Sequence, residues 1–143
     1  MWNSASIAVS DLLADEDQLE LDRLVDSHNL ERSGIQDARL LSIMLRSPGG
    51  SLFAGLHGYT WGGYCEVKSL WVASERRGRG LGSLLLSSAE EEATRRGCRQ
   101  VLLTTHSFQA PGFYRRHGYR EVVSVGDCPS GHAYILMKKI LHA

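Results

Sequence analysis

The sequence has few cysteines, no surplus of charge of either sign and no long apolar run. Its three cysteines, Cys65, Cys98 and Cys128, stand too far apart for a disulfide framework or for the paired spacing of a zinc site. No apolar stretch approaches the roughly 20 residues of a membrane-spanning helix, and the first residues do not resemble a signal peptide. We therefore expect a cytoplasmic protein without a metal site or a membrane partner.

The charges balance over the whole chain but not along it. Sixteen Lys and Arg residues match sixteen Asp and Glu residues, so the net charge of zero does not point to a nucleic-acid partner. Residues 1–22 carry only acidic charges, whereas arginines crowd positions 76–120. The acidic segment suits a cationic substrate, or it is simply a solvated helix face. The arginines lack the interleaved aromatic platform of a nucleic-acid site.

The chain is long enough for one domain with a sizeable core, and we expect residues 1–143 to form that domain. Apolar patterns predict strands at residues 6–10, 40–46, 51–59, 64–72, 99–105, 119–125 and 133–139. Helical spacing and capping signals predict helices at residues 15–31, 81–96 and 111–117. Elements in this order indicate an α/β domain with a mixed sheet.

Residues 76–83, Arg-Arg-Gly-Arg-Gly-Leu-Gly-Ser, join a predicted strand to a predicted helix. A turn with so little side-chain bulk lets backbone N–H groups converge on one point. The unpaired N–H groups of the helix's first turn, the positive end of its dipole and the arginines all favour an anion. The segment therefore predicts a site for a cofactor that carries a diphosphate.

Two other phosphate-binding motifs do not fit this segment. Ser83 stands where a Gly-x-Gly-x-x-Gly dinucleotide motif needs its last glycine, and that fold also needs a larger domain. No Gly-Lys-Ser or Gly-Lys-Thr follows, which excludes a P-loop.

Residues 77–82 resemble the acetyl-CoA signature of the GNAT N-acetyltransferase superfamily. Residues 110–119 resemble the family's second marker, Ala-x-x-Phe-Tyr followed by a glycine and an aromatic residue. The order of elements from Ile7 to about Lys139 is similar too. Residues 105–111 and 129–132 resemble a small bacterial acetyltransferase subgroup without an assigned common substrate. The resemblance implies the GNAT fold: a mixed, mostly antiparallel central sheet with helices on both faces and a splay between its two central parallel strands.

The resemblance also implies that acetyl-CoA is the acyl donor and lies in this splay. The backbone of Leu70, Trp71 and Val72 would hold the pantetheine and polarise the acetyl carbonyl. The other residues that would contact the cofactor are Arg77, Gly78, Arg79, Gly80, Gly82, Ser83 and Ser107. Ser107 stands where family members often carry Asn, so the chain departs from the family pattern there.

Acetylation of an amine needs a base for the amine and an acid for the departing thiolate. Glu66 is the candidate base, because it precedes Gly80 by fourteen residues, as the base glutamate does in similar histone-acetylating members. Strand alternation places it on the same face as Leu70, unless the strand has a bulge here, as similar proteins of the family often do. The alternative is a surface carboxylate paired with Lys68 or a nearby Arg. Tyr114, in the second marker, is the candidate acid, since reference pKa values of phenols and thiols differ by only about 1.5 units. Its alternative role is that of a core aromatic residue.

A covalent acetyl-cysteine on Cys65 is disfavoured, because no His is close in sequence and the thiol should point away from Glu66. The candidate acceptor-binding residues are Tyr59, Trp61, His106, His132 and Tyr134. We expect direct transfer of the acetyl group to a primary amine of a small cationic molecule, in detoxification or antibiotic resistance. The alternatives are a protein or peptide acetyltransferase and a non-catalytic acyl-CoA sensor. Many similar proteins dimerise, so a homodimer stays open.

Overall fold

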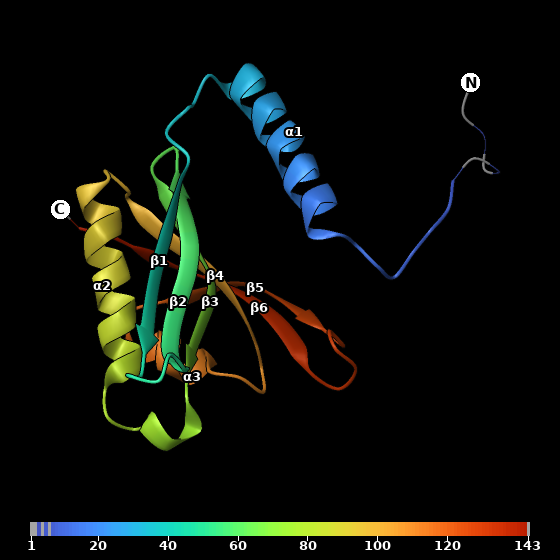
Figure 1. Ribbon diagram of the computed structural model, residues 1–143. Helices are drawn as coiled ribbons and strands as arrows, with labels where there is room; N and C mark the ends of the chain where they lie inside the picture. The colour runs from blue at the N-terminus through green and yellow to red at the C-terminus, as the bar shows by residue number, and fades with distance from the viewer. Residues whose placement is uncertain (1–2, 4, 6, 143) are drawn as a thin grey trace. The chain divides into compact units, whose positions relative to one another are not determined.

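The structure is a computed structural model that describes residues 3, 5 and 7–142 (Figure 1). The chain divides into two units, Met1–Gln36 and Asp37–Ala143. In the described part of the chain, the first unit contains one α-helix, and the second contains a six-stranded sheet and two α-helices. No helix in the described part of the chain is both long and apolar enough to cross a membrane.

Helix α1 (Asp15–Ser33) forms where the sequence predicts it. Three carboxylates occupy its first turn, where the positive end of the helix dipole stabilises them. At the other end the backbone N–H of Gly34 donates to the carbonyl oxygen of Leu30 at 2.7 Å and caps the helix.

The strand predicted at residues 6–10 is wrong. Residues 7–10 have no strand conformation, and Ser6 lies outside the described residues. Ile7 and Val9 give the alternation of a strand, but a strand is stabilised by its neighbour, and no described strand pairs with them. Val9 is accordingly 95% exposed.

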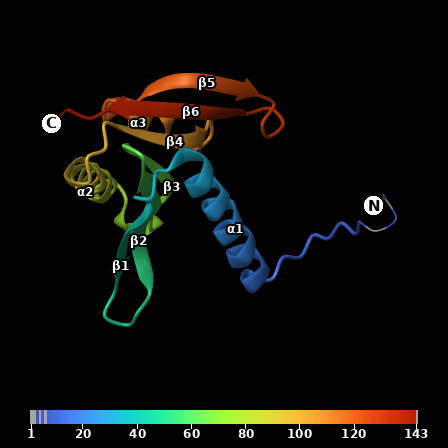
Figure 2. The same ribbon diagram turned by 90° about the horizontal axis from the view of Figure 1, so that it is seen from above.

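The sheet has the strand order β1-β2-β3-β4-β6-β5. Figure 2 shows β1 and β2 strongly rotated relative to β4, β6 and β5. All neighbouring strands are antiparallel except β3 and β4, so the predicted mixed, mostly antiparallel sheet is confirmed. The strands are β1 (Arg39–Arg46), β2 (Leu52–Trp61), β3 (Tyr64–Val72), β4 (Gln100–His106), β5 (Arg120–Gly126) and β6 (Ala133–Ile140).

The two parallel strands separate towards their C-terminal ends. Residues 64–67 of β3 pair with residues 100–103 of β4. Beyond that point β3 continues to Val72 and β4 to His106 without further pairing. The predicted splay between the central parallel strands is therefore confirmed, and it opens at the ends of β3 and β4.

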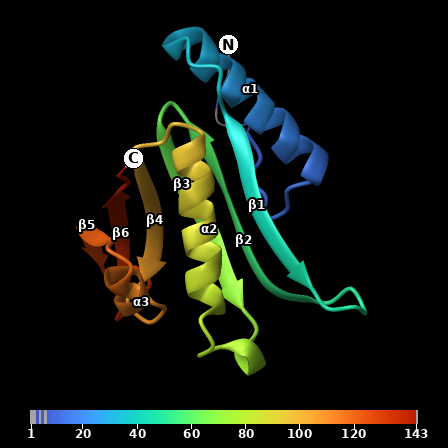
Figure 3. The same ribbon diagram turned by 90° about the vertical axis from the view of Figure 1, so that its left-hand side faces the viewer.

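Helix α2 (Leu81–Arg95) packs on β1, β2 and β3 (Figure 3). Its buried side chains recur at helical spacing and form one apolar face, Leu85, Leu86, Ala89 and Ala93. This face joins the strand residues of the core, which include Leu56, Val67, Val101, Leu103 and Met137. The short helix α3 (Pro111–Arg116) lies beside the first turn of α2, where the ring of Phe113 packs against Gly82.

A half-buried carboxylate connects α2 to β6 and to the residue that precedes β5. Glu90 accepts a hydrogen bond of 2.7 Å from the Tyr119 hydroxyl and pairs with Lys139 Nζ at 2.8 Å. Its side chain is only 13% exposed, so water cannot replace these partners freely. Burial, together with the charge of Glu90, raises the pKa of the Tyr119 phenol far above its usual value.

We expect Glu90→Ala to lower the free energy of unfolding by about 1–3 kcal/mol. The substitution leaves Lys139 partly buried without its counter-charge and removes the acceptor of Tyr119. Urea unfolding measures the change, and Glu91→Ala is the matched control on the exposed side of the same helix, with an expected change within about 0.5 kcal/mol. Equal changes in the two variants would contradict a role for the buried network.

Candidate active site

A cleft of about 610 Å³ opens where β3 and β4 separate. Its walls come from the end of β3, the turn that follows it, the first turn of α2 and the segment that leads into α3. The lining residues are 70–72, 76–78, 80–83, 108–110, 113, 114 and 116. The segment predicted to bind a diphosphate and the segment that carries Tyr114 thus meet in one cavity.

Eight of the ten predicted cofactor residues line the cleft: Leu70, Trp71, Val72, Arg77, Gly78, Gly80, Gly82 and Ser83. Arg79 is exposed and does not line it. Ser107 does not line it either, because its backbone N–H donates to the Ala133 carbonyl and its hydroxyl accepts from the Ala133 N–H, each at 2.9 Å. These two bonds join Ser107 to β6 instead.

The turn between β3 and α2 offers unpaired backbone donors. After Val72 the chain makes one 3-10 turn, η2 (Ser74–Arg76), and then reaches Gly80, the N-cap of α2. Gly80 has a φ of 82°, a left-handed conformation that favours glycine, and no side chain caps the first turn of α2. The first N–H groups of the helix therefore have no intrahelical partner and suit an anion.

Three arginines contribute positive charge to the same cleft, and none of its lining residues in the described chain is acidic. Arg77 Nε donates to the Val72 carbonyl oxygen at 2.8 Å. The guanidinium of Arg76 lies 3.9 Å from the ring centre of Phe53. Both side chains are thereby oriented, and together with Arg116 they make the cleft favourable for phosphate groups.

Tyr114 is a buried residue of α3 that still reaches the cleft. Its ring packs edge-on against Phe113 and Tyr119. Among the described residues the Tyr114 hydroxyl has no hydrogen-bond partner, but its oxygen is not fully shielded from solvent. Burial raises the pKa of this phenol above its usual value. A neutral O–H is therefore held ready to donate into the cleft.

Glu66 does not share a strand face with Leu70, so this expectation is wrong. β3 has a bulge at Lys68: Val67 lies opposite Gly58 of β2, and Ser69 lies opposite His57. The extra residue reverses the alternation, so Leu70 faces α2 and Glu66 faces away from it. A Cβ on Gly58 would overlap the Glu66 carbonyl oxygen, which explains why glycine stands opposite the bulge.

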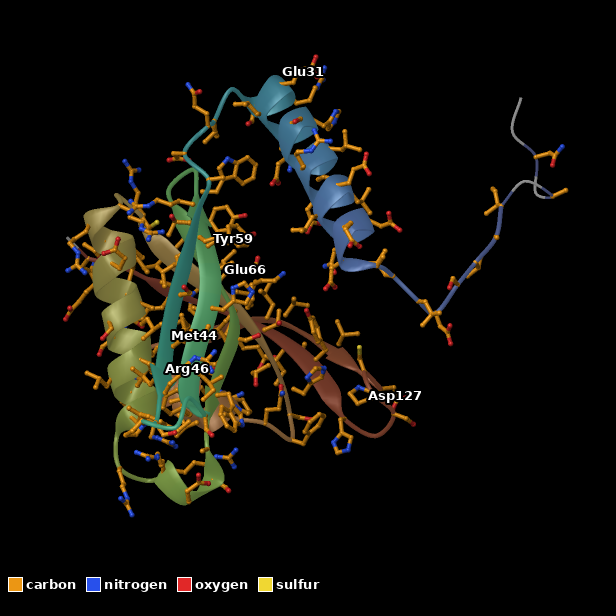
Figure 4. The ribbon with its side chains drawn as sticks, viewed as in Figure 1. Glu31, Met44, Arg46, Tyr59, Glu66 and Asp127 are labelled. Atoms are coloured by element: carbon orange, nitrogen blue, oxygen red, sulfur yellow. The ribbon has the colours of Figure 1, made fainter. Side chains whose placement is uncertain are left out.

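The carboxylate of Glu66 has one partner on each oxygen. Oε1 accepts from the Tyr59 hydroxyl at 3.2 Å, and Oε2 lies 3.3 Å from Lys68 Nζ. The Tyr59 hydroxyl also lies 3.0 Å from that of Tyr64, and burial raises the pKa of Tyr59. Figure 4 shows Tyr59 and Glu66 side by side on the strands. The ion pair predicted as the alternative is present, and the carboxylate is still 31% exposed and accessible.

The predicted acceptor residues form two aromatic groups. In the first, Tyr59 and Trp61 each contact the ring of Tyr64 edge-on. The second contains His106, Phe108, His132 and Tyr134, with ring centres 4.9–5.3 Å apart between neighbours.

Strand register decides which side of the sheet these rings occupy. Tyr59 lies opposite Glu66, Glu66 beside Leu102, and His106 opposite Tyr134. Paired residues share a face, and Leu102 and His106 are four residues apart on one strand. The sheet face that α2 does not cover therefore carries Glu66, Tyr59, His106 and Tyr134.

The cysteines do not form a nucleophilic or metal site. Cys65 is fully buried, and burial raises the pKa of its thiol to about 11, so the reactive thiolate is disfavoured. Cys98 is buried too, and Cys128 is half-buried; all three are free thiols. In the described ranges no three His, Cys, Asp or Glu side chains are grouped to hold a metal ion.

Several residues of the cleft were not singled out from the sequence. Phe108, which is 56% exposed, and Gln109 belong to the loop between β4 and α3. Gln109 Oε1 accepts from the backbone N–H of His106 at 2.7 Å and fixes this loop. The sequence signals were their position just before the second marker and the resemblance of residues 105–111 to an acetyltransferase subgroup. Neither shows which loop side chains enter the cleft, because side-chain direction in a loop has no periodic pattern.

Comparisons with known proteins agree with this geometry. The model of the GNAT acetyltransferase domain matches residues 48–121. An acetyltransferase of Agrobacterium fabrum is 36% identical over 79% of this chain and 82% of that protein. The blasticidin-S acetyltransferase of Streptomyces morookaense is 38% identical over 78% of this chain and 85% of that protein.

A solved structure is similar over nearly the whole chain. A protein of Agrobacterium tumefaciens assigned as an acetyltransferase has a TM-score of 0.84 and 32% identity, covering 94% of this chain and 98% of that one. The glycine turn, the arginines and the volume of the cleft fit the acetyl-CoA that acetyltransferases of this kind use. The chain belongs to the GNAT acetyltransferase family and is an acetyl-CoA-dependent enzyme.

Proposed function

We propose that the enzyme transfers the acetyl group of acetyl-CoA to a primary amine of a small cationic molecule by direct attack in a ternary complex. The observation that carries this proposal is the cleft itself. Its lining includes both the glycine-rich turn before α2 and Tyr114 of α3. In this arrangement Gly78–Ser83 hold the pyrophosphate, and the ends of β3 and β4 flank the reacting thioester.

The proposed chemistry moves two protons. The amine nitrogen attacks the carbonyl carbon of the thioester, a C–N bond forms, and the C–S bond breaks. Glu66 accepts a proton from the amine, directly or through water, and Tyr114 donates its proton to the departing thiolate. The raised pKa of Tyr114 keeps the phenol protonated until that step. The buried thiol of Cys65 takes no part.

The nature of the acceptor is inferred from three features. The aromatic groups and Glu66 share the sheet face that α2 does not cover, so we infer that the amine approaches from the side opposite α2. Residues 1–22 carry only acidic charge, which attracts a cationic molecule. The similarity to a blasticidin-S acetyltransferase supports an antibiotic or a comparable amine as the acceptor.

The test follows thiol release from acetyl-CoA with a panel of amines. The panel includes blasticidin S, aminoglycosides, polyamines and basic peptides, and mass spectrometry locates the transferred acetyl group. We expect turnover with a small cationic amine and a product acetylated on nitrogen. Preferred turnover of peptides would favour a protein acetyltransferase. Tight acetyl-CoA binding with no thiol release for any amine would favour a sensor.

We expect Gly80→Asp to weaken coenzyme A binding by about 10- to 100-fold, since a carboxylate near a phosphate costs on the order of 1–4 kcal/mol. Calorimetric titration measures the Kd. Gly50→Asp is the matched control, because Gly50 also has a left-handed φ, 93°, but lies in the β1–β2 turn away from the cleft. Normal affinity in Gly80→Asp, or an equal loss in both variants, would contradict the placement of the pyrophosphate.

A further inference from the structure

A histidine outside the cleft is bonded to a serine that lines it. Ser83, in the first turn of α2, lies 2.8 Å from His117 through its Oγ and the ring Nε2. Ser83 lines the cleft, whereas His117 does not. Neither the base nor the acid of the proposed reaction involves this pair, so its position at the phosphate turn requires its own explanation.

The ring of His117 is held in place from two sides. Its centre lies 4.7 Å from that of Phe113, which also packs against Gly82. Its backbone N–H donates to the Tyr114 carbonyl at 3.0 Å, at the end of α3. The histidine is half-buried. A ring fixed in this way holds its partner hydroxyl in one orientation.

The direction of the Ser83–His117 hydrogen bond decides what the serine offers to an anion. A serine hydroxyl has one hydrogen to donate. If Nε2 accepts that hydrogen, the serine presents only lone pairs to the cleft, which repel a phosphate oxygen. If Nε2 carries a hydrogen and donates to Oγ, the serine hydrogen is free to donate to the phosphate.

We propose that His117 is a positioning residue for the cofactor pyrophosphate, donating from Nε2 to Ser83 Oγ so that the serine hydroxyl donates to a phosphate oxygen. This proposal rests on the proposed placement of the pyrophosphate at Gly78–Ser83. It assigns to the residue before the glycine of the second marker a role in holding the acyl donor. The nearby charges agree with an anion there, since Arg116 lines the cleft while Arg115 is paired with Glu121 at 3.5 Å.

The test compares His117→Leu, His117→Gln, Ser83→Ala and the double variant of His117→Leu with Ser83→Ala. Calorimetry gives the Kd for coenzyme A, and thiol release gives kcat/KM for acetyl-CoA and for S-acetylpantetheine, which lacks the pyrophosphate. We expect His117→Leu and Ser83→Ala each to raise the Kd by about 10-fold, as for one lost hydrogen bond to a charged group. The double variant should be no worse than either single variant, because both remove the same bond.

The conservative variant separates positioning from packing. Glutamine places an amide N–H near the former Nε2, so His117→Gln should bind coenzyme A within about 3-fold of the unsubstituted enzyme. All variants should use S-acetylpantetheine as the unsubstituted enzyme does. Equal losses with both donors, additive effects in the double variant, or an unchanged Kd in His117→Leu would overturn the proposal.

The outcomes also distinguish this proposal from the proposed function. If Gly80→Asp binds coenzyme A normally, the pyrophosphate does not bind at the turn. The proposed placement of the pyrophosphate and the proposed role of His117 are then both wrong. If Gly80→Asp loses affinity while His117→Leu does not, only the role of His117 falls. Failure to acetylate any amine would remove the proposed function and leave the Kd measurements intact.

Discussion

Tyr114→Phe is expected to lower kcat by about 10²–10⁴-fold while the Kd for acetyl-CoA changes little. The substitution removes one oxygen from a buried ring that keeps its edge-on contacts with Phe113 and Tyr119. Without the phenol, the thiolate must leave unprotonated or take its proton from water. Stopped-flow or steady-state thiol release gives kcat, and calorimetry gives the Kd.

The pH dependence supplies a second measurement on Tyr114. A phenol donates only while it is protonated, and burial moves its pKa upward. The contribution of Tyr114 is therefore present at neutral pH and is lost only as the pH rises through a pKa that lies above the usual value of a phenol. Tyr119→Phe is a control, since it removes the hydroxyl of a buried phenol that does not line the cleft. A similar loss of kcat in both variants, or none in Tyr114→Phe, would contradict the assignment of the acid.

Glu66→Gln is expected to lower kcat by a comparable factor, about 10²–10⁴, with acetyl-CoA affinity unchanged. The amide keeps the shape of the side chain and one acceptor for the Tyr59 hydroxyl, but it cannot take a proton from the amine. The loss should shrink as the pH rises, because a larger fraction of the amine is then already neutral. A pH–rate profile at saturating amine measures this.

Two controls separate a base from a surface ion pair. Lys68→Met removes the partner of Glu66 Oε2 and should change kcat by less than the loss of the carboxylate itself. Glu121→Gln neutralises another partly exposed, paired carboxylate far along the sheet and should leave kcat unchanged. If Glu66→Gln behaves like Glu121→Gln at saturating substrate, Glu66 is only a surface carboxylate.

Much of the fold could be predicted because its signals are local. The helix from Asp15, the turn at Gly80 and the strand that ends at Val72 each depend on capping, glycine or apolar spacing within a few residues. The false strand at residues 6–10 shows the limit of the same reasoning. Two alternating apolar residues fit a strand pattern, but the pattern contains no information about whether a partner strand exists.

The resemblance allowed for a bulge in this strand but did not give its position, although the sequence contains a trace of it. The strand residues on the α2 side of the sheet are Cys65 and Val67 before the bulge and Leu70 and Val72 after it. Their numbers change from odd to even, which a single uninterrupted strand would not do. The glycine at position 58 marks the same place on the partner strand.

The candidate site was predicted best where backbone conformation determines it. The glycine turn needs no side-chain information, and its residues line the cleft as expected. Arg79, Ser107 and the pair Ser83–His117 depend on side-chain direction and on contacts between elements distant in sequence. Such contacts leave no periodic trace, so the sequence alone did not distinguish them.

Because of the bulge, the number of residues in β3 determines which face of the sheet each of its side chains occupies. Removal of Lys68 would restore the regular alternation of side chains along β3. The residues before and after position 68 could then no longer both keep the sheet faces that they occupy now. Either Leu70 and Val72 would leave the apolar layer under α2, or Glu66 would turn into it as an unpaired charge. In the proposed arrangement, this one inserted residue allows a single strand to serve the acyl donor on one side of the sheet and the acceptor on the other.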